Sequence, residues 1–132
     1  MSRGLPLEGL SILVVEDEPF IALDISDALQ AAGARVVGPV NSLADAHGFA
    51  RSEPLDAAIL DVQIGHEDIS VVPDTLAERS IPFLFYSGFG GGHALRQRWT
   101  DAIWLNKPCR GEDVVAAMRA LILANDKKPR ID

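Results

Sequence analysis

One short run decides the fold of this chain: Leu55-Asp56-Ala57-Ala58-Ile59-Leu60-Asp61. The run is mostly apolar and follows Glu53-Pro54, which is typical of a strand that is buried on both faces of a parallel sheet. Open α/β sheets bind their ligands just outside the carboxyl ends of such strands. Because Asp61 stands at that end, the sequence predicts a functional site around this carboxylate.

Three other strand-like runs also end in polar or charged residues. They are 11–15 followed by Glu16-Asp17-Glu18, 82–86 followed by Ser87-Gly88, and 102–106 followed by Lys107-Pro108. The carboxyl ends of parallel strands meet at the same edge of a sheet, so acids, a hydroxyl and a lysine are expected to gather there. Asp61 is predicted to be the reactive centre of that cluster.

Helical spacing of apolar residues between these runs completes the pattern. Five strands that alternate with five helices form a right-handed, doubly wound parallel sheet. Of the two common strand orders, a chain with five strands favours the flavodoxin-like order 2-1-3-4-5. The sequence predicts a second strand at 34–38 and helices from Glu18-Pro19 to Gly33, at 43–51 after a cap at Ser42, from Val72-Pro73 to just before Ile81-Pro82, around Leu95 and Trp99, and around 114–122.

The size and the charge of the chain limit what it can be. Its 132 residues suit a single domain at 1–132, with a core at about 9–124, a loose lead-in and a short disordered tail. Asp and Glu outnumber Lys and Arg by 19 to 12, so the surface should repel nucleic acids. The one cysteine, Cys109, excludes an internal disulfide, and no run is suited to a signal peptide or a membrane span. We therefore expect a cytoplasmic protein.

Three carboxylates, those of Glu16, Asp17 and Asp61, are predicted at the ends of two adjacent strands. Two unit charges about 4 Å apart repel each other by roughly 4 kcal/mol at an effective dielectric near 20, so a cation is expected between them. Oxygen ligands suit Mg²⁺ better than zinc. Lys107 adds an ammonium group and Ser87 a hydroxyl. A carboxylate nucleophile beside a metal ion and a lysine is the arrangement that phosphoryl transfer needs.

The same residues resemble a known family. The segments Val14-Val15-Glu16-Asp17-Glu18-Pro19, Leu60-Asp61-Val62, Ser87-Gly88 and Lys107-Pro108 are similar to those of the receiver (CheY-like) domain of two-component response regulators. The resemblance extends over nearly the whole chain. It implies a signalling domain rather than an enzyme with a separate substrate, in which Asp61 accepts a phosphoryl group from a histidine kinase or a phosphotransfer protein.

The resemblance also implies roles for the neighbouring residues. Asp17, Asp61 and the backbone carbonyl of Gln63 match Mg²⁺ ligands, and Glu16 matches an acid that acts mostly through water. Lys107 matches the phosphate-binding lysine, with a cis peptide bond before Pro108.

Two further residues match the family's switch positions. Ser87 matches the hydroxyl residue that swings toward the phosphoryl group, and Trp104 stands at the aromatic switch position. The segment 82–90 is also similar to the FAT GUY subfamily of stand-alone receivers, which have HWE or HisKA2-type kinases as partners. Here Tyr86 replaces the Ala of that motif, Ser87 the Thr and Gly90 the final Tyr, and the Met-Pro of most receivers is missing after Asp61.

These features support three hypotheses of different classes. The first is a stand-alone receiver that switches contacts with a downstream protein, or that carries phosphate as a shuttle or sink. The second is a Mg²⁺-dependent phosphatase with Asp61 as nucleophile, which would need a second Asp where Gln63 stands. The third is an interaction module that works without phosphorylation. The intact set of Asp17, Asp61 and Lys107 favours the first.

Overall fold

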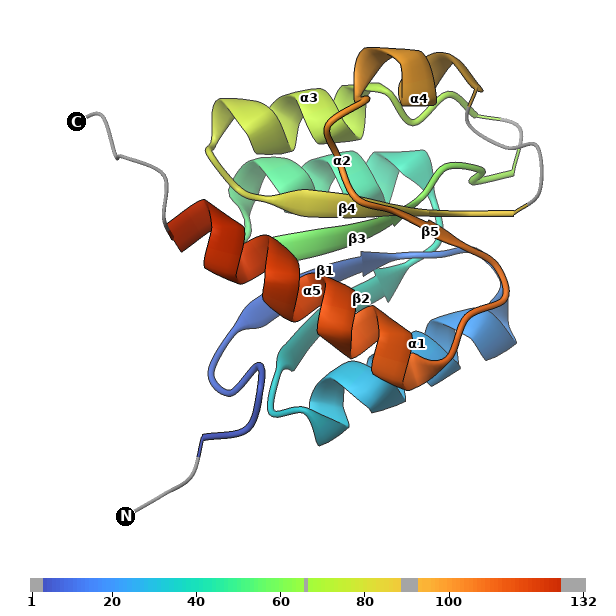
Figure 1. The fold of residues 1–132 in the computed structure, drawn as a ribbon. Helices are drawn as coiled ribbons and strands as arrows, with labels where there is room; N and C mark the ends of the chain where they lie inside the picture. The colour runs from blue at the N-terminus through green and yellow to red at the C-terminus, as the bar shows by residue number, and fades with distance from the viewer. Residues whose placement is uncertain (1–3, 66, 89–92, 127–132) are drawn as a thin grey trace.

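The computed structural model describes residues 4–65, 67–88 and 93–126. Their parallel strands stand in the order β2-β1-β3-β4-β5. Helices α1 and α5 cover one face of the sheet, and α2, α3 and α4 cover the other (Figure 1). This confirms the predicted flavodoxin-like fold. The elements are β1 (Ser11–Val15), α1 (Pro19–Ala31), β2 (Arg35–Val40), α2 (Leu43–Ser52), β3 (Ala57–Asp61), α3 (Val71–Glu78), β4 (Phe83–Ser87), α4 (His93–Arg98), β5 (Trp104–Asn106) and α5 (Gly111–Asp126).

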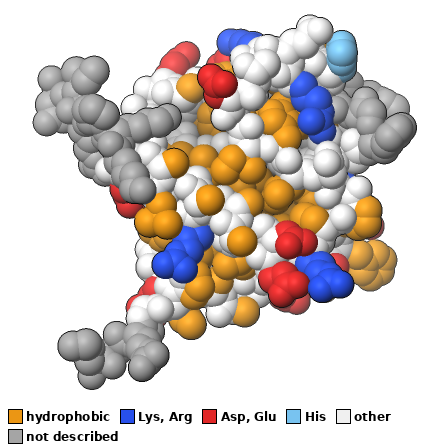
Figure 2. All heavy atoms as spheres, in the orientation of Figure 1, with side chains coloured by type: hydrophobic (Ala, Val, Ile, Leu, Met, Phe, Trp, Pro, Cys, Tyr) orange, Lys and Arg blue, Asp and Glu red, His pale blue; other side chains and the backbone are white. Residues whose placement is uncertain are grey.

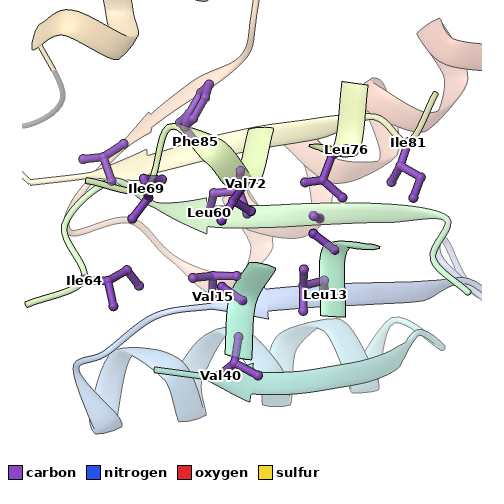
Figure 3. Close-up of a cluster of buried hydrophobic side chains, with 14 of the residues drawn as sticks. Leu13, Val15, Val40, Leu60, Ile64, Ile69, Val72, Leu76, Ile81 and Phe85 are labelled. Atoms are coloured by element: carbon purple, nitrogen blue, oxygen red, sulfur yellow. The ribbon is translucent and has the colours of Figure 1, made fainter. Parts of the chain in front are cut away.

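Strand β3 is buried along its whole length, as its apolar sequence predicts. Its side chains alternate between two cores, because successive residues of a strand point to opposite faces. Ala57 and Ile59 join the core under α1 and α5, and Ala58 and Leu60 join the core under α2 and α3. Figure 3 shows the second core, in which Leu60 is surrounded by apolar side chains from several elements. Asp61 is thus held at the end of a strand that is packed on both sides.

The turn between β1 and α1 fixes the first acidic residues. The side chain of Glu18 caps α1 by accepting a hydrogen bond from the backbone N–H of Ile21 at 2.8 Å, and Pro19 opens the helix. After α1, Gly33 has φ +97°, and a Cβ there would come within 2.8 Å of the Glu8 Cα. The predicted start and stop of this helix are confirmed, and Glu16-Asp17 lies in the short turn before it.

The predicted second strand ends too early. The sequence indicated a strand at 34–38, but β2 is Arg35–Val40 and continues through Pro39. Gly38 has φ +100°, and the pairing with β1 shifts between Leu13 and Val15, so that Val15 pairs with Val40. Pro39 is tolerated because β2 is an edge strand. The last strand is also shorter than the predicted run at 102–106.

The predicted loose lead-in is wrong for the described residues 4–9. Leu7 is fully buried, and its N–H donates to the carbonyl of Ala32 at 2.8 Å. Gly9 donates to the carbonyl of Gly33 at 3.1 Å. This segment is therefore packed against the end of α1. Residues 1–3 and 127–132, which include the predicted disordered tail at 127–130, lie outside the described residues. Among those that are described, no helix has the length and apolar character needed to span a membrane.

Removing the cap of α2 is expected to lower the free energy of unfolding by about 1 kcal/mol. The Ser42 hydroxyl accepts a hydrogen bond from the N–H of Asp45 at 3.2 Å, and alanine offers no acceptor for it. Urea unfolding of Ser42→Ala and wild type measures the difference. Ser42→Asp restores an acceptor and should unfold like wild type, whereas equal stability of all three proteins would contradict the cap.

Candidate functional site

Four strand ends meet at one edge of the sheet. Val15 of β1 pairs with Leu60 of β3, which brings the following residues, Glu16 and Asp61, side by side. On the other side of β3, Ser87 of β4 pairs with Asn106 of β5, and the N–H of Lys107 donates to the carbonyl of Ser87 at 2.8 Å. The predicted gathering of acids, a hydroxyl and a lysine at this edge is what the backbone register produces.

The predicted carboxylates form a tight cluster. One oxygen each from Glu16, Asp17 and Asp61 lies within 4.8 Å of the others. Glu16 and Asp61 are buried, whereas Asp17 is exposed and accepts a hydrogen bond from the N–H of Gly65 at 2.9 Å. Three hard oxygen donors on one side of the site are a donor set that fits a divalent cation. These residues could therefore hold a metal ion.

Lys107 joins the two buried acids. Its Nζ lies 2.9 Å from Oε1 of Glu16 and 3.1 Å from Oδ2 of Asp61. The acid side chains are only 0% and 3% exposed, and that of Lys107 is 18% exposed. Buried carboxylates need such a partner, because an uncompensated charge in the interior is strongly unfavourable. The ammonium group thus balances part of the negative charge of the cluster.

The protonation of the cluster follows from burial and from these ion pairs. Burial, with a smaller contribution from the neighbouring Asp61, raises the pKa of Glu16 to about 7. Burial by itself would lower the pKa of Lys107, but Glu16 and Asp61 outweigh it, so the pKa of Lys107 is raised. Lys107 therefore remains a cation at neutral pH.

Tyr86 is a neighbour of this site that sequence reasoning did not assign to it. The Nζ of Lys107 lies 5.2 Å from the centroid of the Tyr86 ring. Tyr86 and Lys107 also line a cavity of about 340 Å³ together with Cys109. Burial, followed by a hydrogen bond with the Cys109 thiol, raises the pKa of Tyr86 to about 12. One signal in the sequence could have indicated this: Tyr86 stands at a motif position where the similar subfamily has the small residue Ala.

The ionisation of Tyr86, the only tyrosine of the chain, should occur near pH 12 in the folded protein. In the unfolded chain it should occur near pH 10. The raised pKa means that stability is lost as the pH rises from about 10 to 12, because the unfolded chain releases its proton first. Absorbance of tyrosinate, measured with and without urea, reports both midpoints. Cys109→Ala should lower the folded midpoint, and a folded midpoint near 10 in wild type would contradict the burial of the hydroxyl.

Two other predicted site residues lie at the same edge of the sheet as Asp61 but make contacts of their own. The N–H of Gln63 donates to Oδ1 of Asp61 at 3.0 Å; the role of its carbonyl as a metal ligand stays a prediction. Ser87 is fully buried, and its hydroxyl donates to the carbonyl of Gly88 at 3.0 Å. The same hydroxyl accepts a hydrogen bond from Arg96 at 3.3 Å.

Trp104, predicted at the switch position, belongs to an aromatic and cationic stack. Its ring lies on Phe85, with centroids 4.2 Å apart and an interplanar angle of 19°. The guanidinium of Arg96 lies 4.4 Å from the centre of the Trp104 ring. Arg96 was not predicted as a site residue. Leu95 indicated the short helix α4, but the sequence has no apolar periodicity there that would show which way the Arg96 side chain points.

Comparison with known proteins finds chains that are similar to this one in sequence and fold. No family model matches the sequence. The solution structure of SdrG from Sphingomonas melonis Fr1 is 37% identical, covers 93% of this chain and 99% of that one, and has a TM-score of 0.76. A response regulator receiver protein from Sinorhizobium medicae WSM419 is 26% identical, with 90% and 98% covered and a TM-score of 0.77.

A curated relative resembles the chain over part of its length. The phyllosphere-induced regulator PhyR from Methylorubrum extorquens is 27% identical over an alignment of 110 residues, and the match covers 81% of this chain. The match spans only 41% of that regulator. The relative therefore bears on the domain described here, and the activity of the whole regulator does not transfer to this chain.

Proposed function

The chain belongs to the response regulator receiver family, and from this we propose that Asp61 accepts a phosphoryl group from a histidine kinase or a histidine phosphotransfer protein. The observation that carries the proposal is the position of the Asp61 carboxylate. Its Oδ2 lies 3.1 Å from the Lys107 ammonium, and it shares a cluster with the oxygens of Glu16 and Asp17. A nucleophilic carboxylate beside a fixed cation and a set of metal-binding oxygens suits phosphoryl transfer.

The proposal includes a Mg²⁺ ion as cofactor. Glu16, Asp17 and Asp61, with the backbone carbonyl of Gln63, would hold it, and the grouping of three carboxylate oxygens within 4.8 Å supports this choice. When bound, Mg²⁺ neutralises charge on the transferred phosphoryl group.

The chain's own residues would carry the transfer as follows. A carboxylate oxygen of Asp61 attacks phosphorus, and the bond from phosphorus to the donor's imidazole nitrogen breaks with its electron pair left on nitrogen. Lys107 holds its positive charge against the growing negative charge of the site. The product adds about −1.5 to −2 charge at the end of β3. The Ser87 hydroxyl then turns to donate to a phosphoryl oxygen.

Exposed apolar side chains support action through protein partners. Phe20 and Leu23 of α1 are 77% and 55% exposed, and Leu123 of α5 is 48% exposed. Figure 2 shows apolar side chains gathered on the face that carries α5. Patches of this kind are typical of protein-binding surfaces. The stand-alone role, the FAT GUY assignment, an HWE or HisKA2-type kinase as partner and the cytoplasmic location stay predictions.

The phosphatase hypothesis is less well supported. At the second position after Asp61, Gln63 offers an amide in place of the required acid, and its N–H is bonded to the Asp61 carboxylate. The interaction-module hypothesis would gain support if an Asp61→Ala variant bound its partner as wild type does. Turnover of a phosphomonoester by the purified protein would favour the phosphatase.

Removal of the metal ion is expected to stop phosphorylation. Purified protein with MgCl₂ and a small acyl phosphate donor should incorporate phosphate, and an excess of EDTA should reduce the label to background, because the acidic cluster then repels the donor. The label should be released by hydroxylamine, as expected of an acyl phosphate. A label that persists in EDTA, or that resists hydroxylamine, would contradict the proposal.

A further inference from the structure

Arg96 of α4 bridges two strands at the edge of the sheet that carries Asp61. Its Nη2 donates to the Ser87 hydroxyl at 3.3 Å and to Oδ1 of Asn106 at 3.2 Å. Its Cζ also lies 4.4 Å from the centre of the Trp104 ring. One guanidinium therefore contacts the hydroxyl at the end of β4 and an aromatic ring of β5 at the same time.

The two ends of this bridge differ in how firmly they are held. The Trp104 ring is stacked on Phe85, and its Nε1 donates to the carbonyl of Trp99 at 3.1 Å. The Ser87 hydroxyl has a single proton, which it donates to the carbonyl of Gly88 at 3.0 Å. Rotation about one side-chain torsion redirects that proton. The Ser87 end of the bridge can therefore change while the Trp104 ring stays in place.

We infer that Arg96 couples the state of Asp61 to the surroundings of Trp104, an inference that rests on the proposed phosphorylation. When Ser87 turns its hydroxyl toward a phosphoryl group, either Arg96 moves with the hydroxyl or the hydrogen bond between them breaks. The added negative charge attracts the guanidinium toward the site. Arg96 thereby leaves the face of the Trp104 ring. A charge added at the end of β3 thus changes the surroundings of a side chain of β5. Arg96 acts here as a positioning residue.

Helix α4 has contacts that allow Arg96 to move without loss of the helix. Leu95 is buried in the core on that side of the sheet. Arg98 forms an ion pair with Asp74 of α3 at 2.5 Å. Leu95 therefore anchors α4 independently of Arg96, whereas the Arg98 ion pair, with the Arg98 side chain 55% exposed, contributes little to stability. Arg98 also lies 5.5 Å from the ring of Trp99, which makes it a matched control for a cation beside an aromatic ring.

The test uses the ¹⁵N-labelled 132-residue chain with Mg²⁺ and beryllium fluoride, a mimic of the phosphoryl group. The readout is the indole N–H signal of Trp104, identified by its loss in Trp104→Phe. The amide signal of Gln63, which is bonded to Asp61, reports occupation of the site itself. The variants are Arg96→Met, which removes the charge and the donors, Arg96→Gln, which removes the charge but keeps an NH₂ donor group on a shorter side chain, and Arg98→Met as control.

In wild type and in Arg98→Met, the mimic should shift both signals. In Arg96→Met the Gln63 signal should still shift, but the Trp104 signal should lose most of its response, and Arg96→Gln should behave in the same way. A Trp104 response of wild-type size in a folded Arg96 variant would overturn the coupling. Failure of the proposed function would be seen differently, as an unchanged Gln63 signal in wild type with the mimic, with a small phosphodonor and with a phosphorylated histidine donor.

Discussion

Replacing Asp61 with Asn is expected to reduce the incorporation of phosphate from a small donor to background. The amide is not a nucleophile and cannot form an acyl phosphate. The substitution also replaces one of the three carboxylates of the cluster with a neutral amide, whose oxygen is a weaker ligand for a cation. Both changes act on the same step, so no residual slow labelling of this site is expected. Radiolabelled donor and gel autoradiography, at equal Mg²⁺ for both proteins, measure the effect.

Asp61→Asn should remain folded, so the loss cannot be ascribed to unfolding. The variant removes a buried negative charge that lies beside Glu16, and Lys107 keeps its 2.9 Å ion pair with Glu16. Thermal unfolding should therefore show no loss of stability. Asp101→Asn, at an exposed position, is the matched control and should be labelled like wild type. Labelling that survives in Asp61→Asn would remove Asp61 from its proposed role.

Lys107→Met is expected to have the largest effect on stability at the site. The substitution leaves two buried carboxylates, those of Glu16 and Asp61, without the ammonium that lies 2.9 and 3.1 Å from them. Breaking a buried ion pair by removing one partner costs about 3 kcal/mol or more. Because proton uptake by a carboxylate would relieve part of this cost, the comparison is made by urea unfolding at pH 8 without metal.

Mg²⁺ should reduce the difference in the free energy of unfolding between Lys107→Met and wild type. The divalent cation supplies positive charge to the same carboxylates and no longer meets the repulsion of the ammonium. The variant should therefore gain more stability from MgCl₂ than wild type does. Arg110→Met is the control: its ion pair with Glu112 is fully on the surface, with side chains 83% and 73% exposed. That variant should change stability by less than about 1 kcal/mol. Equal stabilities of Lys107→Met and wild type would contradict the electrostatic account.

The cluster of functional residues could be predicted because parallel sheets obey simple geometry. A buried strand such as β3 ends where its apolar run ends, and its register with β1 brings Glu16 next to Asp61. Helix ends were predictable for a similar reason, since Pro19 and Gly33 have local effects that do not depend on the rest of the chain. General rules for strand ends and helix ends were enough for these parts.

Contacts set by tertiary packing could not be predicted in this way. Strand β2 extends through Pro39 because pairing with β1 and a place at the edge outweigh the local preference. Leu7 lies in a segment without periodicity, yet it fills the core beside α1. Arg96 depends on the rotation of a short helix, which one apolar residue does not define. The missed features therefore depend on how particular side chains pack, whereas the predicted ones follow from general rules for parallel sheets and helix ends.

Chemical trapping of the phosphorylated residue tests the central claim most directly. Protein treated with Mg²⁺ and a phosphodonor is reduced with borohydride, which converts an aspartyl phosphate to homoserine, and the modified position is located by peptide mass spectrometry. We expect homoserine at position 61 and an unmodified Asp17. Modification at another carboxylate, or none in protein that carries the label, would contradict it.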